Sequence, residues 1–234
     1  MASHRLIIAI DGPSGAGKGT VARTIAERLT YRHVDTGAMY RAVAWLASLR
    51  GLDLQDGLAI ADLAASASIE VNGAVAIDGH DVTHAIRTPE IDRAAAIVAR
   101  HAAVRAVLVE RQRAFGEVGG VVMEGRDIGS VVFPRADVKV YLDATPEERA
   151  RRRAVDTARQ AVRADTELAT VADALAARDT SDRTRAVSPL TRVDDAIYID
   201  TTGLAIEDVV ERVMDVVRNA MGRVEQSRVQ SPES

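Results

Sequence analysis

The chain has 234 residues, of which 47% are hydrophobic and 27% are charged, as in an ordinary globular protein. Its net charge of -4 is too small to draw the whole molecule onto nucleic acid or anionic lipid. Because no cysteine is present, disulfides, thiolate metal sites and a cysteine nucleophile are excluded, and a cytoplasmic location is expected. The apolar run at 6–10 is too short for a signal peptide or a membrane span, so we expect neither.

Short apolar segments rich in β-branched residues alternate with longer amphipathic segments along most of the chain. The short segments predict buried strands at 6–10, 33–35, 121–124, 138–142 and 196–200. The longer segments predict helices at 20–29, 39–50, 58–67, 91–115 with a break near His101, 146–182 with a break near Asp165, and 205–217. This alternation is typical of an α/β fold, in which helices cover both faces of a parallel sheet.

Residues 69–77 follow a different pattern, because apolar and polar residues alternate there with a period of two. Asn72 and Gly73 lie at the centre of this segment, and Asn-Gly is a preferred pair for a two-residue type I′ turn. We therefore predict a small antiparallel hairpin inserted between the helices.

Residues 12–20, Gly-Pro-Ser-Gly-Ala-Gly-Lys-Gly-Thr, follow the first predicted strand and open the first predicted helix. Glycines let successive N–H groups turn toward phosphate oxygens, and the helix N-terminus adds partial positive charge. Lys18 supplies a full charge that can follow a phosphoryl group during transfer. The usual pattern places Ser or Thr directly after the lysine, whereas Gly19 here precedes Thr20. We interpret the segment as a phosphate-binding loop rather than a glycine-rich turn without a ligand.

Three further segments add arginines to the predicted loops. They lie at 35–41, 125–129 and 182–189. Ligands of open α/β sheets bind beyond the carboxyl ends of the strands, which is where the first two segments lie. A guanidinium group grips phosphate with two parallel N–H donors and stays charged. These segments therefore predict a site at which two anionic molecules are brought together.

The motifs GPSGAGKGT, DTGAMYR, GRDIGSVVFP and DRTRAVSPL, in this order and spacing, closely resemble bacterial cytidylate kinases, a family of P-loop nucleoside monophosphate kinases. The resemblance extends from Arg5 to about Val217. It implies a P-loop NTPase-type parallel sheet flanked by helices, a monophosphate-binding insert with a small antiparallel hairpin, and a helical lid. One kinase domain is expected, with its core at about 1–35, 116–148 and 190–222, the insert at about 36–115, the lid at about 149–189 and a frayed tail at 223–234.

The same resemblance implies transfer of the γ-phosphoryl group of ATP to CMP or dCMP, giving ADP and CDP or dCDP, with Mg²⁺ accompanying ATP. No direct metal ligand from the protein is expected, although Thr20 is a candidate. The implied ATP-binding residues are Gly12, Pro13, Ser14, Gly15, Ala16, Gly17, Lys18, Gly19, Thr20, Arg149, Arg152 and Arg153. The implied CMP-binding residues are Thr36, Arg41, Arg105, Arg126, Asp127, Asp182 and Arg185. Lys18, Arg126 and Arg185 are the implied catalytic residues.

Within the CMP site the resemblance implies separate tasks. Asp182 would accept hydrogen bonds from the ribose hydroxyls, and Arg105 and Asp127 would face the cytosine. The serine with which the family also contacts the base falls on Ala96 in this chain. The phosphate of CMP would be held by Thr36, Arg41, Arg126 and Arg185.

Several residues have alternative interpretations. The arginine cluster at 149–153 is a lid over ATP, a solvated helix face or a nucleic-acid surface; nearby acids and few aromatic residues argue against the last. Arg149, Arg152 and Arg153 share one helical face by their spacing, whereas Arg151 is predicted to be solvated. Glu124 and Asp143 either stabilise helix starts or hold water around magnesium, and Arg178 is placed to bridge both substrates.

Two rival functions are open to test. One is a different small-molecule P-loop kinase, acting on shikimate or another monophosphate. The other is a nucleotide-binding regulatory module, which generally needs a guanine-reading Asn-Lys-x-Asp segment that this chain lacks. The expected partners are the substrates ATP and CMP or dCMP, with no nucleic acid and no membrane, and a monomer is expected.

Overall fold

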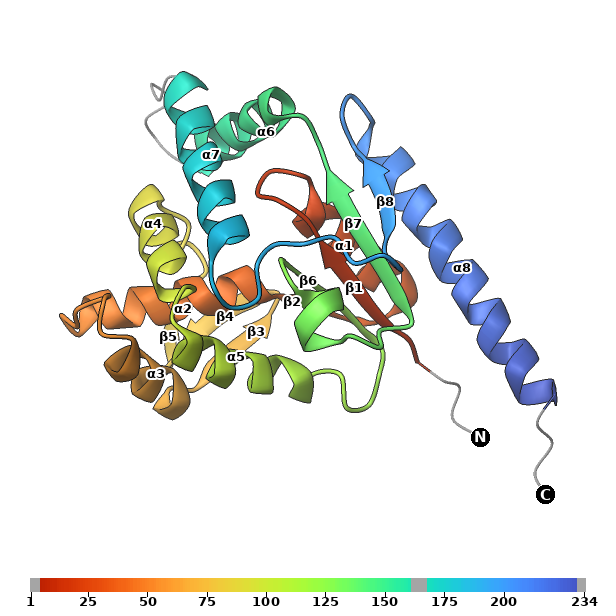
Figure 1. The fold of residues 1–234 in the computed structure, drawn as a ribbon, viewed down its shortest axis with the longest axis horizontal. Coiled ribbons are helices and arrows are strands. Elements are labelled where there is room, and N and C mark those ends of the chain that lie inside the picture. Colours follow the sequence, from red (N-terminus) through yellow and green to blue (C-terminus); the bar gives the residue numbers. More distant parts are fainter. Residues whose placement is uncertain (1–4, 161–167, 231–234) are drawn as a thin grey trace.

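The computed structural model describes residues 5–160 and 168–230, and a five-stranded sheet forms its centre (Figure 1). The strands are β1 (Ile7–Asp11), β2 (Arg32–Asp35), β6 (Val121–Gly125), β7 (Val138–Asp143) and β8 (Ile197–Asp200). They lie in the order β2-β6-β1-β7-β8, and every pair is parallel. All five predicted strands are confirmed, and the strand that leads into the phosphate loop is central.

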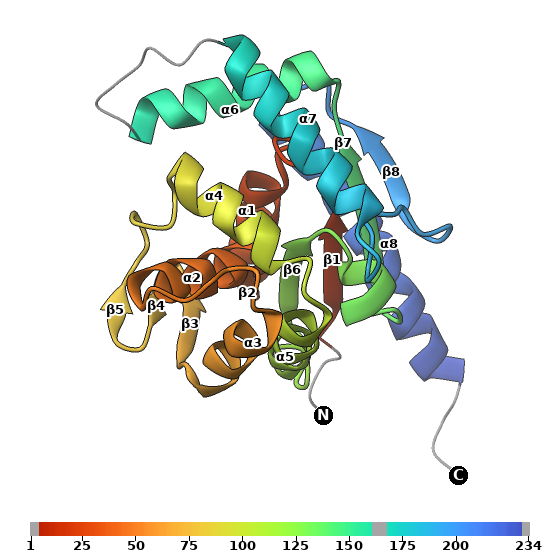
Figure 2. The ribbon, with the colours of Figure 1, turned by 60° about the vertical axis from the view of Figure 1, so that its left-hand side comes forward.

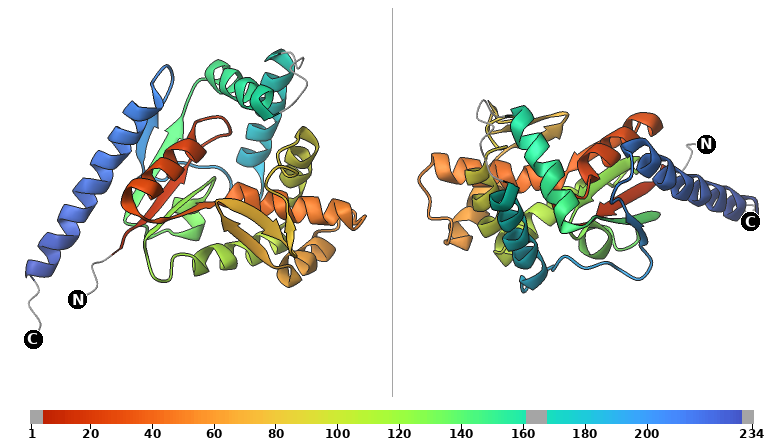
Figure 3. Two further views of the ribbon diagram at one scale, coloured as in Figure 1. Left: turned by 180° about the vertical axis from the view of Figure 1, so that it is seen from behind. Right: turned by 90° about the horizontal axis from the view of Figure 1, so that it is seen from above.

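Alternate residues of β1 enter two separate cores on the two faces of the sheet. Ile8 and Ile10 pack against α1 (Lys18–Leu29) and α8 (Ile206–Gln230), which lie side by side in Figure 3. Ala9 belongs to the core of the opposite face, which contains residues of α2 (Thr36–Leu49), α3 (Gly57–Ser66) and α5 (Ala102–Ala114). Because helices cover both faces, the predicted α/β class is confirmed.

The insert between β2 and β6 contains a second, antiparallel sheet of three strands. These are β3 (Ile69–Asn72), β4 (Ala74–Ile77) and β5 (His80–Asp81). The predicted helix at 91–115 is divided into α4 (Pro89–Val98) and α5, and the predicted break is confirmed because His101 lies at the N-cap of α5.

The turns of this small sheet differ from the prediction. Asn72 pairs with Ala74, so the first turn is centred on Gly73 and is not a two-residue type I′ turn. The two-residue turn is the next one, between β4 and β5, where Asp78 (φ 47°) and Gly79 (φ 78°) both have positive φ. Asp-Gly is as good a type I′ signal as Asn-Gly, and the pairing register decides which of the two is used.

Two helices, α6 (Pro146–Gln160) and α7 (Leu168–Thr184), lie beyond the carboxyl ends of the strands (Figure 2). They form most of the segment predicted to be a lid, and we call them the lid below. Pro146 begins α6, as its fixed φ favours. The helices pack against each other through Ala150, Val171 and Leu175. The break predicted near Asp165 lies outside the described residues.

Two segments were not anticipated from the sequence. After β6 the chain forms a π-helical turn, η1 (Ile128–Val132). The helix predicted to end at Val217 continues to Gln230, so residues 223–230, predicted as a frayed tail, are helical in α8. The longer helix follows from an apolar stripe that continues past Val217, since Met221 and Val224 still pack against the core. None of the described helices is long and apolar enough to cross a membrane.

Alanine substitutions at two glycines with positive φ distinguish the cost of backbone strain from the cost of steric overlap. At Gly12 (φ 146°) an added Cβ would lie 1.9 Å from the carbonyl oxygen of Leu142, whereas at Gly79 (φ 78°) it would meet nothing within 4 Å. We expect Gly79→Ala to lower the free energy of unfolding by about 1–2 kcal/mol, from strain alone. Gly12→Ala should lower it by more than about 3 kcal/mol, because strain and overpacking add. Urea unfolding without nucleotide measures both; equal losses would contradict the close approach of the phosphate loop to β7.

Candidate active site

The phosphate loop connects β1 to α1, as predicted, and forms one wall of the site. Gly17 has a φ of 92° at the N-cap of α1, a conformation that glycine adopts without strain. The Lys18 ammonium is buried and donates to the carbonyl oxygen of Pro13 at 2.7 Å. Burial, together with the charge of Arg126, lowers the pKa of Lys18 to about 7. Without a ligand, Lys18 is therefore close to its titration midpoint at neutral pH.

Arg149 does not lie where the sequence places it. Its guanidinium is behind the phosphate loop, where it donates to the carbonyl oxygen of Ser14 at 3.2 Å and to that of Ala144 at 3.1 Å. Asp179 of α7 pairs with it at 2.5 Å. These contacts occupy the buried guanidinium, so Arg149 supports the phosphate loop and does not line the cavity. Helical spacing alone could not reveal this, because it does not say which face meets the loop.

Arg152 and Arg153, the two other arginines of α6 that were expected to bind ATP, both line the cavity, as does Arg151. Arg152 donates to the hydroxyl of Thr201 at 2.9 Å and to its carbonyl oxygen at 2.6 Å, so it connects α6 to the loop after β8. Arg151, predicted to be solvated, has a side chain that is 63% exposed and pairs with Glu148 of the same helix.

The segment after β2 forms the opposite wall of the site. Asp35 caps α2 by accepting from the N–H of Ala38, and its other oxygen accepts from Arg41 at 2.9 Å. The buried hydroxyl of Thr36 donates to the carbonyl oxygen of Glu124 at 2.7 Å. The Nε of Arg41 is buried and has no hydrogen-bond partner within the described structure. Arg41 is thus held in place by Asp35 and still has a donor for an anion.

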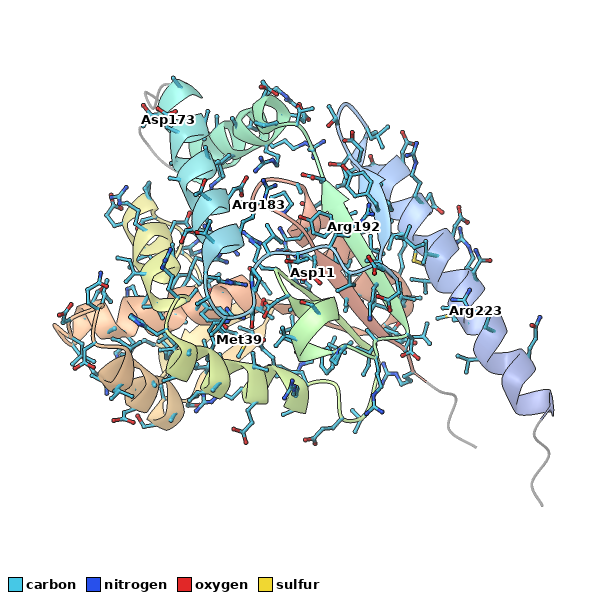
Figure 4. The ribbon with its side chains drawn as sticks, viewed as in Figure 1. Asp11, Met39, Asp173, Arg183, Arg192 and Arg223 are labelled. Atoms are coloured by element: carbon cyan, nitrogen blue, oxygen red, sulfur yellow. The ribbon has the colours of Figure 1, made fainter. Side chains whose placement is uncertain are left out.

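The loop after β6 is tied to the end of β1 through one carboxylate. Asp11 accepts from the N–H groups of Ile128 and Gly129 at 2.8 and 2.7 Å. Burial raises the pKa of Asp11 to about 6 despite these two hydrogen bonds. Figure 4 labels Asp11 near the centre of the molecule, below α7. The contact fixes the position of Arg126 and Asp127, because these residues immediately precede Ile128 in the chain.

An ion-pair network joins this loop to the end of α7. The Nε of Arg126 donates to Asp182 at 2.8 Å, and Arg185 lies 3.8 Å from Asp182 and 3.7 Å from Asp127. Although burial opposes the charge of Asp182, the guanidiniums of Arg126 and Arg178 keep its pKa below the ordinary value. The Nη2 of Arg185 makes no hydrogen bond among the described residues. The network therefore holds its arginines in place and leaves a donor available.

Arg105 and Asp127, the residues expected to face the base, are paired with each other and buried. The Arg105 guanidinium also lies 5.5 Å from the centre of the Tyr40 ring. Ala96 of α4 lines the same cavity, so the position at which the family has a serine does face the site. Tyr40 was given no role from the sequence, although it stands next to Arg41 in one of the motifs.

A single cavity of about 850 Å³ joins these groups, a volume in the range of small-molecule sites. Of the predicted site residues, Gly12, Pro13 and Arg149 do not line it. Asp92 of α4, which no motif singles out, does line it. The predicted residues that the fold brings together around the cavity are Ser14, Gly15, Ala16, Gly17, Lys18, Gly19, Thr20, Thr36, Arg41, Arg105, Arg126, Asp127, Arg152, Arg153, Asp182 and Arg185.

Residues 8–219 match the family model described as cytidylate kinase. The chain belongs to the cytidylate kinase family. It is 46% identical over 224 residues to the cytidylate kinase of Geobacillus sp. (strain WCH70), covering 94% of this chain and 99% of that protein. It is 44% identical over 218 residues to the cytidylate kinase of Bacillus subtilis (strain 168), covering 91% of this chain and 96% of that protein. The resemblance drawn from the motifs and the assignment as a nucleoside monophosphate kinase are confirmed.

Solved structures support the fold independently of the sequence. A gluconokinase from Sinorhizobium meliloti 1021 aligns with a TM-score of 0.51 and 14% sequence identity, covering 97% of this chain and 100% of that one. At this identity the likeness concerns the fold alone. The cytidylate kinase fold of this chain therefore shares its architecture with a kinase of distant sequence.

Oxygen donors beside the phosphate loop fit the Mg²⁺ that accompanies ATP in such kinases. An added Cβ at Gly19 would lie 3.2 Å from the Glu124 carboxylate, so glycine before Thr20 gives that carboxylate room. Mg²⁺ prefers oxygen ligands and keeps several of its waters. Glu124, whose Oε1 also lies 3.1 Å from Nε2 of His33, would hold water around the ion, and the exposed residue Thr20 is the candidate direct ligand. Asp143 instead accepts from the N–H of Ala144 at 2.9 Å and stabilises a turn.

The lowered pKa of Lys18 predicts that ATP binding takes up a proton. At pH 8 a lysine with a pKa of about 7 is mostly neutral, and bound phosphates raise its pKa because they favour the charged form. We therefore expect uptake of about one proton per ATP bound at pH 8, and an affinity for ATP that falls as the pH rises above about 7. Calorimetric titration in two buffers of different ionisation enthalpy measures the uptake.

The chain contains its own control for this experiment, because Lys139 is the only other lysine. Lys18→Met should abolish the proton uptake, and Lys139→Met should retain it. Uptake that persists in Lys18→Met would assign the proton to another group.

Proposed function

We propose that the cavity binds ATP at the phosphate loop and CMP or dCMP at the insert, and transfers the γ-phosphoryl group between them. The products are ADP and CDP or dCDP. The observation that carries the proposal is that the phosphate loop and the Arg105–Asp127 pair line the same cavity. Membership of the cytidylate kinase family supports the same donor and acceptor.

The acceptor phosphate would be bound between the two walls of the site. Arg41 and Arg185 each have a buried N–H group that makes no hydrogen bond to the residues described. Such groups gain a charge-assisted hydrogen bond when a phosphate arrives. The Thr36 hydroxyl and the guanidinium of Arg126 complete the phosphate site. The Asp182 carboxylate, which Arg126 holds at 2.8 Å, would accept from the ribose hydroxyls.

Transfer needs position and charge rather than a protein nucleophile. An oxygen of the CMP phosphate attacks the γ-phosphorus in line, and the bond from that phosphorus to the β–γ bridging oxygen breaks as the new one forms. Lys18, Arg126 and Arg185 stabilise the charge that the moving group carries. Mg²⁺, when bound with ATP, neutralises phosphate charge. Arg152 and Arg153 of the lid cover the donor side and help to exclude water.

Base selection would rest on the Arg105–Asp127 pair. The carboxylate of Asp127 accepts from the N4 amino group of cytosine, and the guanidinium of Arg105 donates to N3 or O2. Uracil presents a carbonyl oxygen at position 4, which would face the same carboxylate without a hydrogen bond. Ala96 removes one supporting contact, so we expect weaker discrimination than in relatives that have serine there.

The remaining expectations belong to the same proposal. The enzyme acts as a monomer in the cytoplasm on small-molecule substrates, without nucleic acid or membrane. The mixed charge of the chain, with a net value of -4, supports the absence of a nucleic-acid partner. An acceptor without a base, such as shikimate, is disfavoured, because it would leave the Arg105–Asp127 pair without a base to bind.

A coupled assay of ADP release with CMP, dCMP, UMP, AMP and shikimate as acceptors tests the function. We expect rapid ADP release with CMP and dCMP only. Lys18→Met should lower turnover by roughly 10²–10³, because it removes one preorganised charge at the transfer point. Lys139→Met should retain most of the activity. ADP release that is independent of the acceptor, or fastest with shikimate, would contradict the proposal.

Asp127→Asn tests how the base is selected. The amide can donate to the uracil oxygen, so kcat/KM for CMP should fall and that for UMP should fall less or rise. The ratio of the two kcat/KM values should therefore decrease by at least about tenfold. Sites that hydrogen-bond a substrate group discriminate by up to about 10⁴–10⁵ against an analogue that lacks the group. Asp195→Asn is the control, because it removes the ion pair with Lys139 at a residue that does not line the cavity. An unchanged CMP/UMP ratio in Asp127→Asn would show that the base is selected elsewhere, with Arg105 the next residue to change.

A further inference from the structure

Asp92 belongs to the insert but its carboxylate binds the lid. It lies in the first turn of α4, and its side chain is only 16% exposed. One partner is Arg153 of α6 and the other is Arg178 of α7, whose Nη1 lies 3.2 Å from Oδ1. One carboxylate therefore joins three helices, α4, α6 and α7; α6 and α7 lie above α4 in Figure 2.

A second contact joins the same two parts of the chain. Just beyond α4, Arg100 donates to the hydroxyl of Ser181 in α7 at 3.2 Å. Asp92 and Arg100 are about two helical turns apart, so α4 meets α7 at more than one point along its length. The insert and the lid are thus in contact on the side of the cavity that Asp92 lines.

A simpler explanation is that Asp92 only stabilises the N-terminus of α4 through the helix dipole. Glu90 occupies the same turn and serves that purpose without leaving its own helix. Its side chain is 70% exposed and pairs with Arg93 at 3.3 Å. Asp92 differs, because it is mostly buried and its partners lie 61 and 86 residues away in the chain. Its location is therefore explained by the lid rather than by the helix.

Arg178 connects this contact to the transfer point. Its side chain is 19% exposed. Partial burial, followed by the charge of Arg126, lowers the pKa of Arg178, and the charge of Asp92 opposes that shift. It is also close enough to Lys18 to depress the pKa of that lysine. The Nε of Arg178 has no hydrogen-bond partner in the described part of the chain. Asp92 thus holds one side of a guanidinium whose other side can donate to a phosphate.

We propose that Asp92 is a positioning residue that couples the acceptor insert to the donor lid, so that ATP and CMP each strengthen the binding of the other. The proposal rests on the proposed function, since it needs ATP at the lid and CMP at the insert. A substrate that holds α6 and α7 in place keeps Arg153 and Arg178 at Asp92, and through that carboxylate it holds α4 of the insert in place as well. The second substrate then meets a site that is already assembled, which is a coupling free energy between two sites.

The test compares Asp92→Asn with Glu90→Gln, which removes a charge from the same helical turn. Calorimetry measures the affinity for CMP alone and in the presence of a non-hydrolysable ATP analogue. In the wild type and in Glu90→Gln we expect the analogue to tighten CMP binding by about tenfold, a typical coupling. In Asp92→Asn the tightening should fall below about twofold, and Asp92→Glu should restore most of it.

Steady-state kinetics provides a second readout that loss of stability would not move. In Asp92→Asn the KM for CMP at saturating ATP should rise several-fold while the affinity for CMP alone stays unchanged. Full coupling in Asp92→Asn, equal loss in Glu90→Gln, or a wild type without coupling would overturn the proposal. Failure of the proposed function would look different, because the wild type would then not phosphorylate CMP at all.

Discussion

The hydrogen bonds from Ile128 and Gly129 to the Asp11 carboxylate are the contact on which the active site depends. Asp11 ends the central strand β1 and precedes the phosphate loop, whereas Ile128 and Gly129 follow Arg126 and Asp127, which line the same cavity. One carboxylate therefore fixes the distance between the phosphate loop and the loop after β6. Burial of the charged carboxylate costs free energy and raises the pKa of Asp11 to about 6. The two N–H donors offset part of this cost, because they stabilise the charged form.

A second constraint is that the site must bury many cations before its anionic substrates arrive. Unpaired buried charges are strongly destabilising, and in this structure a carboxylate accompanies each arginine concerned. The pairs are Asp35–Arg41, Asp127–Arg105, Asp182–Arg126, Asp92–Arg178 and Asp179–Arg149. In three of these pairs the Nε–H of the arginine makes no hydrogen bond to the described residues, namely in Arg41, Arg105 and Arg178. The protein thus stabilises its cations with acids that orient them, and the donors that remain are available to a ligand.

Local sequence patterns predicted most of the architecture. They were wrong where the sequence fits more than one turn position or helix end equally well. Asn72-Gly73 and Asp78-Gly79 are both type I′ signals, and only the antiparallel register places the two-residue turn at the second. Similarly, the apolar stripe of α8 continues beyond Val217, but whether it is used depends on a neighbouring surface that can bury it. The π-helical turn η1 follows from the Asp11 contact, which joins residues more than a hundred positions apart and has no local signature.

The sequence by itself determined the order of strands and helices, the phosphate loop and the family, because each of these is carried by short patterns of neighbouring residues. The tertiary structure decided which charged groups meet. It placed Arg149 behind the phosphate loop and Arg152 in the cavity, although both belong to one arginine cluster. It also brought Asp92 to two lid arginines that are far away in the chain. Ion-pair partners depend on distances across the folded molecule, and spacing along a helix specifies a face without specifying what that face will contact.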